Sequence, residues 1–270
     1  MTTTRTRLLS LTSITLIGVA ILLSAIKPLN MSIFSAINSA LPSKALWVTI
    51  TNSADVIFVG CLLFITLRKH QRLLTCAVLC GISIHYIVKF AKDSFAILRP
   101  EYGGLDHIVR LGPKLASNNY AMPSGHVASA FMAIIFIIFA HQLKGWKLLL
   151  LFVYGLLVAL SRMAVGAHWP ADVCAGAAIG ITLGLIFVEL ANKESFWFDQ
   201  HINVKKTVQY LTLLAYIPFV VLAITHAKSI HGFTSLINQG IMVLIGLVAL
   251  GFWLVSAASL MNKKAPLAEY

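Results

Sequence analysis

The sequence predicts an all-α fold, a polytopic bundle of membrane-spanning helices. Of its 270 residues, 59% are hydrophobic and only 11% are charged, whereas soluble domains carry about a quarter charged residues. The mean hydropathy is +0.86, and apolar runs of about 20 residues, the length that spans a bilayer, recur along the chain. A net charge of +12 would also suit nucleic acid, but the cations form short clusters between apolar runs, as in oriented membrane proteins. We therefore expect membrane lipids, and no nucleic acid, as partners.

Eight apolar runs qualify as spanning helices. The first follows two arginines and is longer than the core of a signal peptide, so we expect a retained anchor helix. The second is the least regular, because Asn52 and Asp55 lie near its start. An amphipathic stretch, 28–47, is expected to lie at the membrane interface. The predicted spans are 8–26, 50–67, 72–91, 125–141, 147–164, 171–191, 208–226 and 237–261.

The distribution of lysines and arginines predicts the orientation of these spans. With the N-terminus in the cytoplasm, twelve of them fall on the cytoplasmic side and nine on the other. Three of those nine, Lys92, Arg99 and Arg162, belong to polar motifs described below. Without these three, twelve cytoplasmic cations stand against six on the other side. This excess favours the orientation, because cytoplasmic segments are enriched in positive charge. We divide the chain into a six-helix core, 1–195, and a C-terminal two-helix extension, 196–270.

Three short polar motifs interrupt the core, each at the end of an apolar run. They are Lys92-x6-Arg99-Pro100, Pro123-Ser124-Gly125-His126 and Ser161-Arg162-x5-His168-x3-Asp172. In the predicted topology all three face away from the cytoplasm. Together they bring three cations, two histidines and a carboxylate to one membrane face. Such a set can hold a phosphate group and break a bond to it.

The second and third motifs each precede a helix, where backbone N–H groups attract anions. Ser124 is a candidate N-cap, and Gly125 leaves the backbone accessible. His168 and Asp172 are four residues apart, so the carboxylate can reach one ring nitrogen and leave the other free to attack. Each motif alone also has a structural interpretation: snorkelling cations at a helix end, a capped helix start, or a structural ion pair. Their conjunction favours the phosphate site.

Two other features are less specific. Gly176, Gly180 and Gly184 recur every four residues in the sixth span. This face suits close packing within the chain, which we expect, and a homodimer seam is the alternative. In the loop 99–122, His107 and Tyr120 belong to a polar group that would select a head group or be merely solvated.

The three motifs resemble the signature of the type 2 phosphatidic acid phosphatase superfamily, Lys-x6-Arg-Pro, Pro-Ser-Gly-His and Ser-Arg-x5-His-x3-Asp. Every signature position is matched, and the resemblance covers about 50–191. It implies a helical bundle with the phosphate site at its outer end, and the last two spans look like an extension.

The resemblance also implies roles that agree with the chemistry above. His168 would be the nucleophile, Asp172 would orient it, and His126 would protonate the leaving group. The phosphate would be held by Lys92, Arg99, Ser124, Gly125 and Arg162. No metal or other cofactor is expected, because the cations neutralise the charge that magnesium neutralises elsewhere.

The sequence therefore predicts a lipid phosphate or diphosphate phosphatase with a phosphohistidine intermediate. We expect it in the bacterial cytoplasmic (inner) membrane, with the site on the periplasmic side. Substrate candidates are phosphatidic acid, phosphatidylglycerol phosphate, a polyprenyl diphosphate and a lipid A type glycolipid. Two alternatives stay open: a lipid phosphotransferase that uses the same phosphohistidine, and a non-catalytic lipid-binding or transport protein.

Overall fold

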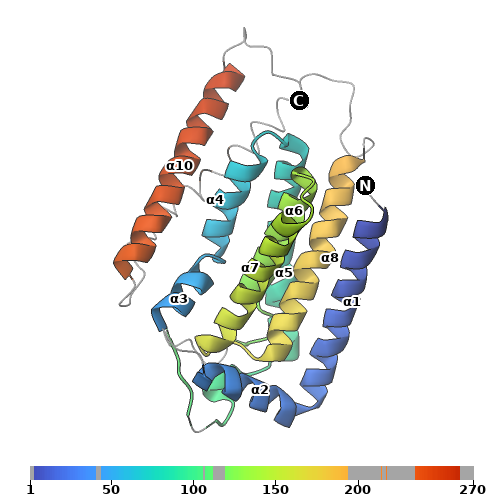
Figure 1. Cartoon of the computed structure of the whole chain (residues 1–270), viewed down its shortest axis with the longest axis vertical. Coiled ribbons are helices and arrows are strands. Elements are labelled where there is room, and N and C mark those ends of the chain that lie inside the picture. Colours follow the sequence, from blue (N-terminus) through green and yellow to red (C-terminus); the bar gives the residue numbers. More distant parts are fainter. Residues whose placement is uncertain are drawn as a thin grey trace.

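The computed structural model is all-helical over the residues that it describes, which are 3–40, 44–105, 107–111, 119–193, 214, 217 and 235–261. Long helices run side by side, and α2 lies across one end of them (Figure 1). The elements are α1 (Thr3–Ala25), α2 (Lys27–Ala40), α3 (Lys44–Asn52), α4 (Val56–Leu67), α5 (Gln71–Phe95), the 3₁₀ turn η1 (Pro100–Tyr102), α6 (Gly125–Ala140), α7 (Trp146–Ala164), α8 (Pro170–Asn192) and α10 (Ser235–Met261).

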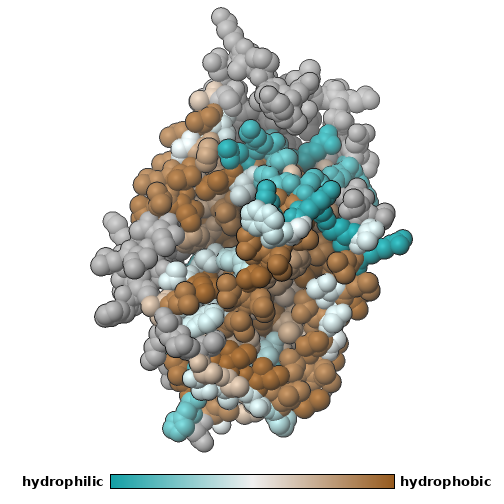
Figure 2. Space-filling view, viewed as in Figure 1, coloured by the Kyte–Doolittle hydropathy of each residue, from teal (hydrophilic) through white to brown (hydrophobic). Residues whose placement is uncertain are grey.

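Within these described residues, α1, α5, α7 and α8 are each long and apolar enough to cross a membrane. α6 is shorter but also apolar. Figure 2 shows hydrophobic residues over the middle of the visible face and hydrophilic ones gathered over the upper ends of α6 and α8. An apolar belt with a polar end is the surface that a lipid bilayer requires.

Helices occupy most of the predicted spans to within a few residues. The first predicted span is occupied by α1, and the third to sixth are occupied by α5, α6, α7 and α8 in order. The last predicted span is occupied by α10. The span predicted at 208–226 lies outside the described residues. α10 packs against α4, and the guanidinium of Arg68 lies 3.9 Å from the ring centroid of Phe252 on α10.

The span predicted at 50–67 is broken near its start. The chain forms α3 and α4, two helices that are bent by 58° at residues 53–55. The cause is Asp55, whose carboxylate accepts the backbone N–H of Ile57 at 2.9 Å and caps α4. A new N-cap inside an apolar run lets the helix restart in another direction, since the cap satisfies a backbone donor that would otherwise be unpaired.

The glycine face of α8 packs against α6. A Cβ at Gly176 or Gly180 would overlap the backbone carbonyl of Ser124 or Ala128, and one at Gly184 would crowd Ile135. The prediction that this face packs closely within the chain is therefore confirmed. This packing brings the N-terminal ends of α6 and α8, which carry the second and third motifs, together.

The amphipathic stretch forms α2 and part of α3, and α2 fixes the same end of the bundle. Asn38 donates from Nδ2 to the carbonyls of Val109, Met163 and Ala164 at 2.9 to 3.1 Å. Asn30 accepts the backbone N–H of Ala171 at 3.1 Å. α2 thus anchors the end of α7 and the start of α8, between which the third motif lies.

Candidate active site

The third motif forms a buried histidine–carboxylate pair at the start of α8. Nδ1 of His168 lies 3.4 Å from Oδ2 of Asp172, and the two side chains are only 3% and 1% exposed. The same oxygen accepts the backbone N–H of Trp169 at 2.8 Å. Because Trp169 is the N-cap and Pro170 begins the helix, the carboxylate is held rigidly. The pair leaves Nε2 of His168 as the reactive nitrogen.

The first motif supplies cations that are tied to the backbone. α5 ends at Phe95 with a left-handed residue, Ala96. Nζ of Lys92 donates to the carbonyl of Tyr120 at 2.8 Å. Arg99 donates from Nε and Nη2 to Asn119 and from Nη1 to the carbonyl of Ala167. These bonds commit three of the five N–H groups of the guanidinium, and they link the loop before α6 to the α7–α8 connection.

The second motif lies beside this connection. The backbone N–H of Ser124 donates to the carbonyl of Asp172 at 3.0 Å. Ser124 is the N-cap residue of α6, as predicted, but its hydroxyl does not cap the helix. Gly125 begins α6 and His126 follows it, with a third of the His126 side chain exposed. The hydroxyl of Ser124 is therefore free to serve the site instead of the helix.

Arg162, in the last turn of α7, completes the cationic wall. Its Nη1 donates to Oγ1 of Thr51 on α3 at 2.6 Å. Within the described part of the chain, three buried polar atoms at this site have no hydrogen-bond partner: Oγ of Ser124, Nε of Arg162 and Oδ1 of Asp172. Buried polar groups are nearly always satisfied, and the first two are donors that suit a phosphate oxygen.

The three motifs meet at His168. Burial and the nearby charges lower the pKa of His168 well below its usual value. A low pKa keeps the imidazole neutral at physiological pH, which is the form that can attack phosphorus. The contributing charges come from all three motifs: Arg162, Arg99, Lys92 and His126. In the described segments, no three histidine, cysteine or carboxylate side chains lie together in a way that would hold a metal ion.

A profile of the PAP2 superfamily matches residues 71–196, which include all three motifs. Over these residues the chain belongs to the PAP2 superfamily. It is 29% identical to an undecaprenyl-diphosphatase from Bacillus subtilis over 176 residues, 61% of this chain and 85% of that protein. It is 27% identical to a lipid A 4′-phosphatase from Bacteroides thetaiotaomicron over 166 residues, 57% of this chain and 68% of that protein.

A solved structure agrees with the fold. The crystal structure of a PAP2-type phosphatidylglycerolphosphate phosphatase from Bacillus subtilis matches with a TM-score of 0.51 and 20% identity, over 70% of this chain and 98% of that chain. At that identity the likeness concerns the fold alone. The relatives show a lipid phosphatase and the apolar helices show a membrane protein. The chain is therefore an integral membrane lipid phosphatase.

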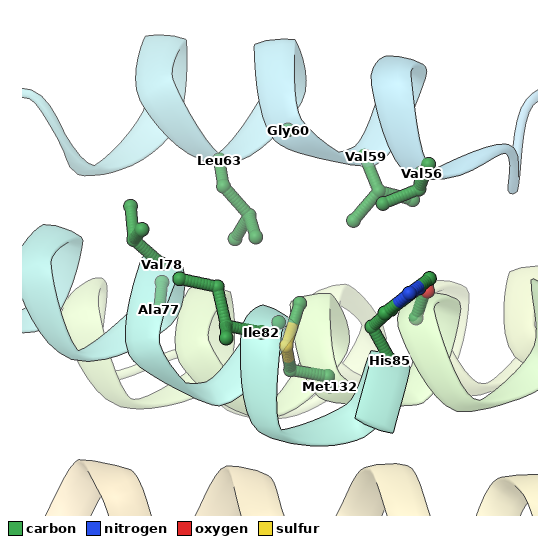
Figure 3. A pocket seen from close by; sticks show the side chains of 11 residues that line it. Val56, Val59, Gly60, Leu63, Ala77, Val78, Ile82, His85 and Met132 are labelled. Carbon is green, nitrogen blue, oxygen red and sulfur yellow. The ribbon is translucent and has the colours of Figure 1, made fainter. Parts of the chain in front are cut away.

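An apolar groove in this phosphatase begins one helical turn from His126. It is a cavity of about 290 Å³ between α4, α5 and α6. Figure 3 shows Val56 and His85 at one end and Leu63 and Val78 at the other, with side chains from both walls pointing into the space. Val56 directly follows Asp55, and Ser129 lies one turn beyond His126. His85 also lines this groove.

Two residues of the site were missed by the sequence analysis. Thr51 binds Arg162, and Asp55 lies 3.9 Å from His126, measured from Oδ2 to Nε2. Both belong to the break between α3 and α4, and the only signal for them was a polar cluster inside an apolar run. In the loop before α6, the carbonyls of Asn119 and Tyr120 hold Arg99 and Lys92, and selection of a head group by this loop stays a prediction. Other loop positions, including Lys114 and Asn118, lie outside the described residues.

Proposed function

We propose that this phosphatase hydrolyses a lipid phosphate or diphosphate through a phosphohistidine at His168. The observation that carries the proposal is the convergence of a neutral, carboxylate-paired histidine with cations from all three motifs. Lys92, Arg99 and Arg162 neutralise the phosphate, and the hydroxyl of Ser124 and the N-terminus of α6 at Gly125 bind its oxygens. Fixed positive charge of this kind stabilises the five-coordinate transition state without a metal ion.

The proposed reaction has two steps. Nε2 of His168 attacks phosphorus, the bond from phosphorus to the leaving oxygen breaks, and His126 gives that oxygen a proton. Water then attacks the phosphohistidine, His126 takes a proton from the water, and the P–N bond breaks to release phosphate. Asp172 orients His168 through Nδ1 and stabilises the positive charge that the ring gains when it attacks.

The groove supports a substrate with a hydrocarbon chain. Its walls are almost entirely apolar, and it starts one helical turn from His126. A lipid whose phosphate sits at His168 can therefore place the first part of its chain between α4 and α5. Relatives of the chain act on undecaprenyl diphosphate and on lipid A, by their names, and either type of substrate carries such a chain.

The decisive experiment uses the purified protein in lipid nanodiscs with phosphatidic acid, phosphatidylglycerol phosphate, a polyprenyl diphosphate and lipid A. Release of free phosphate from any of these, with His168→Ala inactive and still folded, supports the proposal. An acid-labile, alkali-stable phosphoryl group trapped during turnover identifies the intermediate. A phosphorylated second lipid in place of free phosphate would establish the phosphotransferase, and absence of turnover on the whole panel would revive the non-catalytic alternative.

We place the enzyme in the cytoplasmic (inner) membrane of a bacterium, with the site on the outer, periplasmic face. The charge distribution supports this orientation, because the turns on the opposite end of the bundle from the site carry Arg68, Lys69, Arg72, Lys144 and Lys147.

A further inference from the structure

Asp55 lies at the break between α3 and α4 and has two separate partners. Its Oδ1 accepts the N–H of Ile57 and caps α4. Its Oδ2 faces Nε2 of His126 at 3.9 Å, and the two side chains are 29% and 33% exposed. One carboxylate oxygen therefore holds the helix, and that bond fixes where the other oxygen lies.

The charges around His126 indicate what Oδ2 of Asp55 does. His126 is surrounded by Arg162 from α7, Lys92 from α5 and Arg99 from the segment after α5, with His168 also nearby. These cations oppose protonation of the His126 ring, yet an acid catalyst has to carry the proton that it donates. Oδ2 of Asp172 is already committed to Trp169 and His168. Among the described residues, Asp55 is the carboxylate that faces His126.

We infer that Asp55 is a positioning residue for His126. Its Oδ2 accepts a hydrogen bond from Nε2–H, which turns Nδ1 toward the leaving oxygen and stabilises the protonated ring. This inference rests on the proposed function, in which His126 is the acid. The pair would be the counterpart of Asp172 and His168 on the other side of the phosphate. A distance of 3.9 Å closes through a small side-chain rotation, as catalytic hydrogen bonds do when substrate binds, or through one water.

The proton balance is complete with these groups alone. Nδ1–H of His126 passes its proton to the leaving oxygen as the P–O bond breaks. When water attacks the phosphohistidine, Nδ1 takes one proton from that water. Nε2–H stays hydrogen-bonded to Asp55 in both steps.

The helix break serves the site twice, which supports the inference. Within five residues it supplies Thr51, which binds Arg162, and Asp55, which faces His126. An unbroken helix would have no N-cap here. The helix itself would then give no structural reason for a carboxylate at this point of the site.

Asp55→Asn is the informative variant, because asparagine caps a helix as well as aspartate does but carries no charge. With a lipid monoester, whose alcohol leaves poorly, kcat/KM should fall at least about tenfold, and with an aryl phosphate by less than about threefold. The alkaline limb of the pH profile on the lipid should move down by about one unit. Glu189→Gln, an equal charge change near the far end of α8, should alter neither. Equal losses on both substrates with an unmoved pH profile would overturn the inference and leave Asp55 as a cap alone.

Two further measurements separate folding and function from the inference. The unfolding midpoint of Asp55→Asn, and of Asp55→Ser as a second uncharged cap, should match the wild type. The ring signal of His126 in histidine-labelled protein, identified by its loss in His126→Gln, should titrate about one pH unit lower in Asp55→Asn. That titration needs no turnover. A wild type that hydrolyses no lipid but shows the shift would defeat the proposed function and keep the pairing, whereas an active wild type without the shift would defeat the pairing alone.

Discussion

Thr51 accepts a hydrogen bond of 2.6 Å from Nη1 of Arg162, and this bond joins α3 to the end of α7 at the proposed phosphate site. Both side chains are buried. The threonine hydroxyl is therefore a partner that fixes the direction of the guanidinium, although it lies outside all three sequence motifs.

Thr51→Val removes this hydroxyl with little change of shape. A hydrogen bond to a buried charged group is worth about 1.5 to 3 kcal/mol, so we expect kcat/KM to fall by roughly tenfold or more and vanadate inhibition to weaken with it. Thr51→Ser keeps the hydroxyl and should stay close to the wild type. If valine and serine variants behave alike in both assays, Thr51 does not orient Arg162.

Gly176→Ala tests the close packing of α8 against α6. A Cβ there would overlap the carbonyl oxygen of Ser124, so the helices must move apart where the second and third motifs meet. Overpacking typically costs about 1 to 3 kcal/mol. We expect a lower unfolding midpoint together with at least a tenfold loss of kcat, because Ser124 and Asp172 lose their register.

The matched control for that substitution is Gly18→Ala on α1, where the added Cβ has no described atom within 4 Å apart from its own helix backbone and chain neighbours. It should leave both the unfolding midpoint and the turnover unchanged. A Gly176→Ala protein as stable and active as this control would show that the contact is not a constraint.

How far the sequence predicted this molecule depends on the range of the interaction. The start of α8 was predictable because Trp169, Pro170 and Asp172 are neighbours in the chain and form a local cap. The start of α6 at Gly125 was predictable for a similar reason. The motifs then predicted the gathered cations, since each motif lies at a helix end and the connections bring those ends together.

The helix break and its residues were not predictable in this way. Hydropathy sums over 50–67 and does not report a change of chain direction, so one span was expected where α3 and α4 form. The roles of Thr51 and Asp55 depend on contacts with Arg162 and His126, which are far away in the sequence. The anchoring of Lys92 by the carbonyl of Tyr120 is equally invisible, because any residue supplies a carbonyl.

The low pKa of His168 predicts a pH effect on stability. Burial and the surrounding cations keep the folded imidazole neutral, whereas an unfolded one protonates below about pH 6.5. The unfolded state then binds more protons, so stability falls as the pH drops through 6.5, by at most about 1.4 kcal/mol per pH unit. Unfolding of His168→Asn should depend less steeply on pH between 6.5 and 5 than that of the wild type. Equal slopes would mean that His168 titrates normally in the folded protein.

The sidedness of the site can be tested with single cysteines. His107 is exposed in the loop at the site end, and Lys144 is exposed in the turn between α6 and α7 at the other end. In a Cys174→Ala background, chosen because the other three cysteines are buried, His107→Cys should react with an impermeant maleimide in intact spheroplasts. Lys144→Cys should react only after lysis. The reverse pattern would place the site on the cytoplasmic face.

The two histidines should separate by leaving group. His168→Ala removes the nucleophile, so it should abolish turnover of every substrate. His126→Ala removes only the acid, which matters most when the leaving group is a poor one. We therefore expect His126→Ala to lose about 10²- to 10⁴-fold on a lipid monoester, less on a diphosphate and least on a nitrophenyl phosphate, whose phenolate leaves without a proton. With chemistry rate-limiting, the same loss on all three substrates would assign His126 to binding, and the acid would have to be another group at the mouth of the groove.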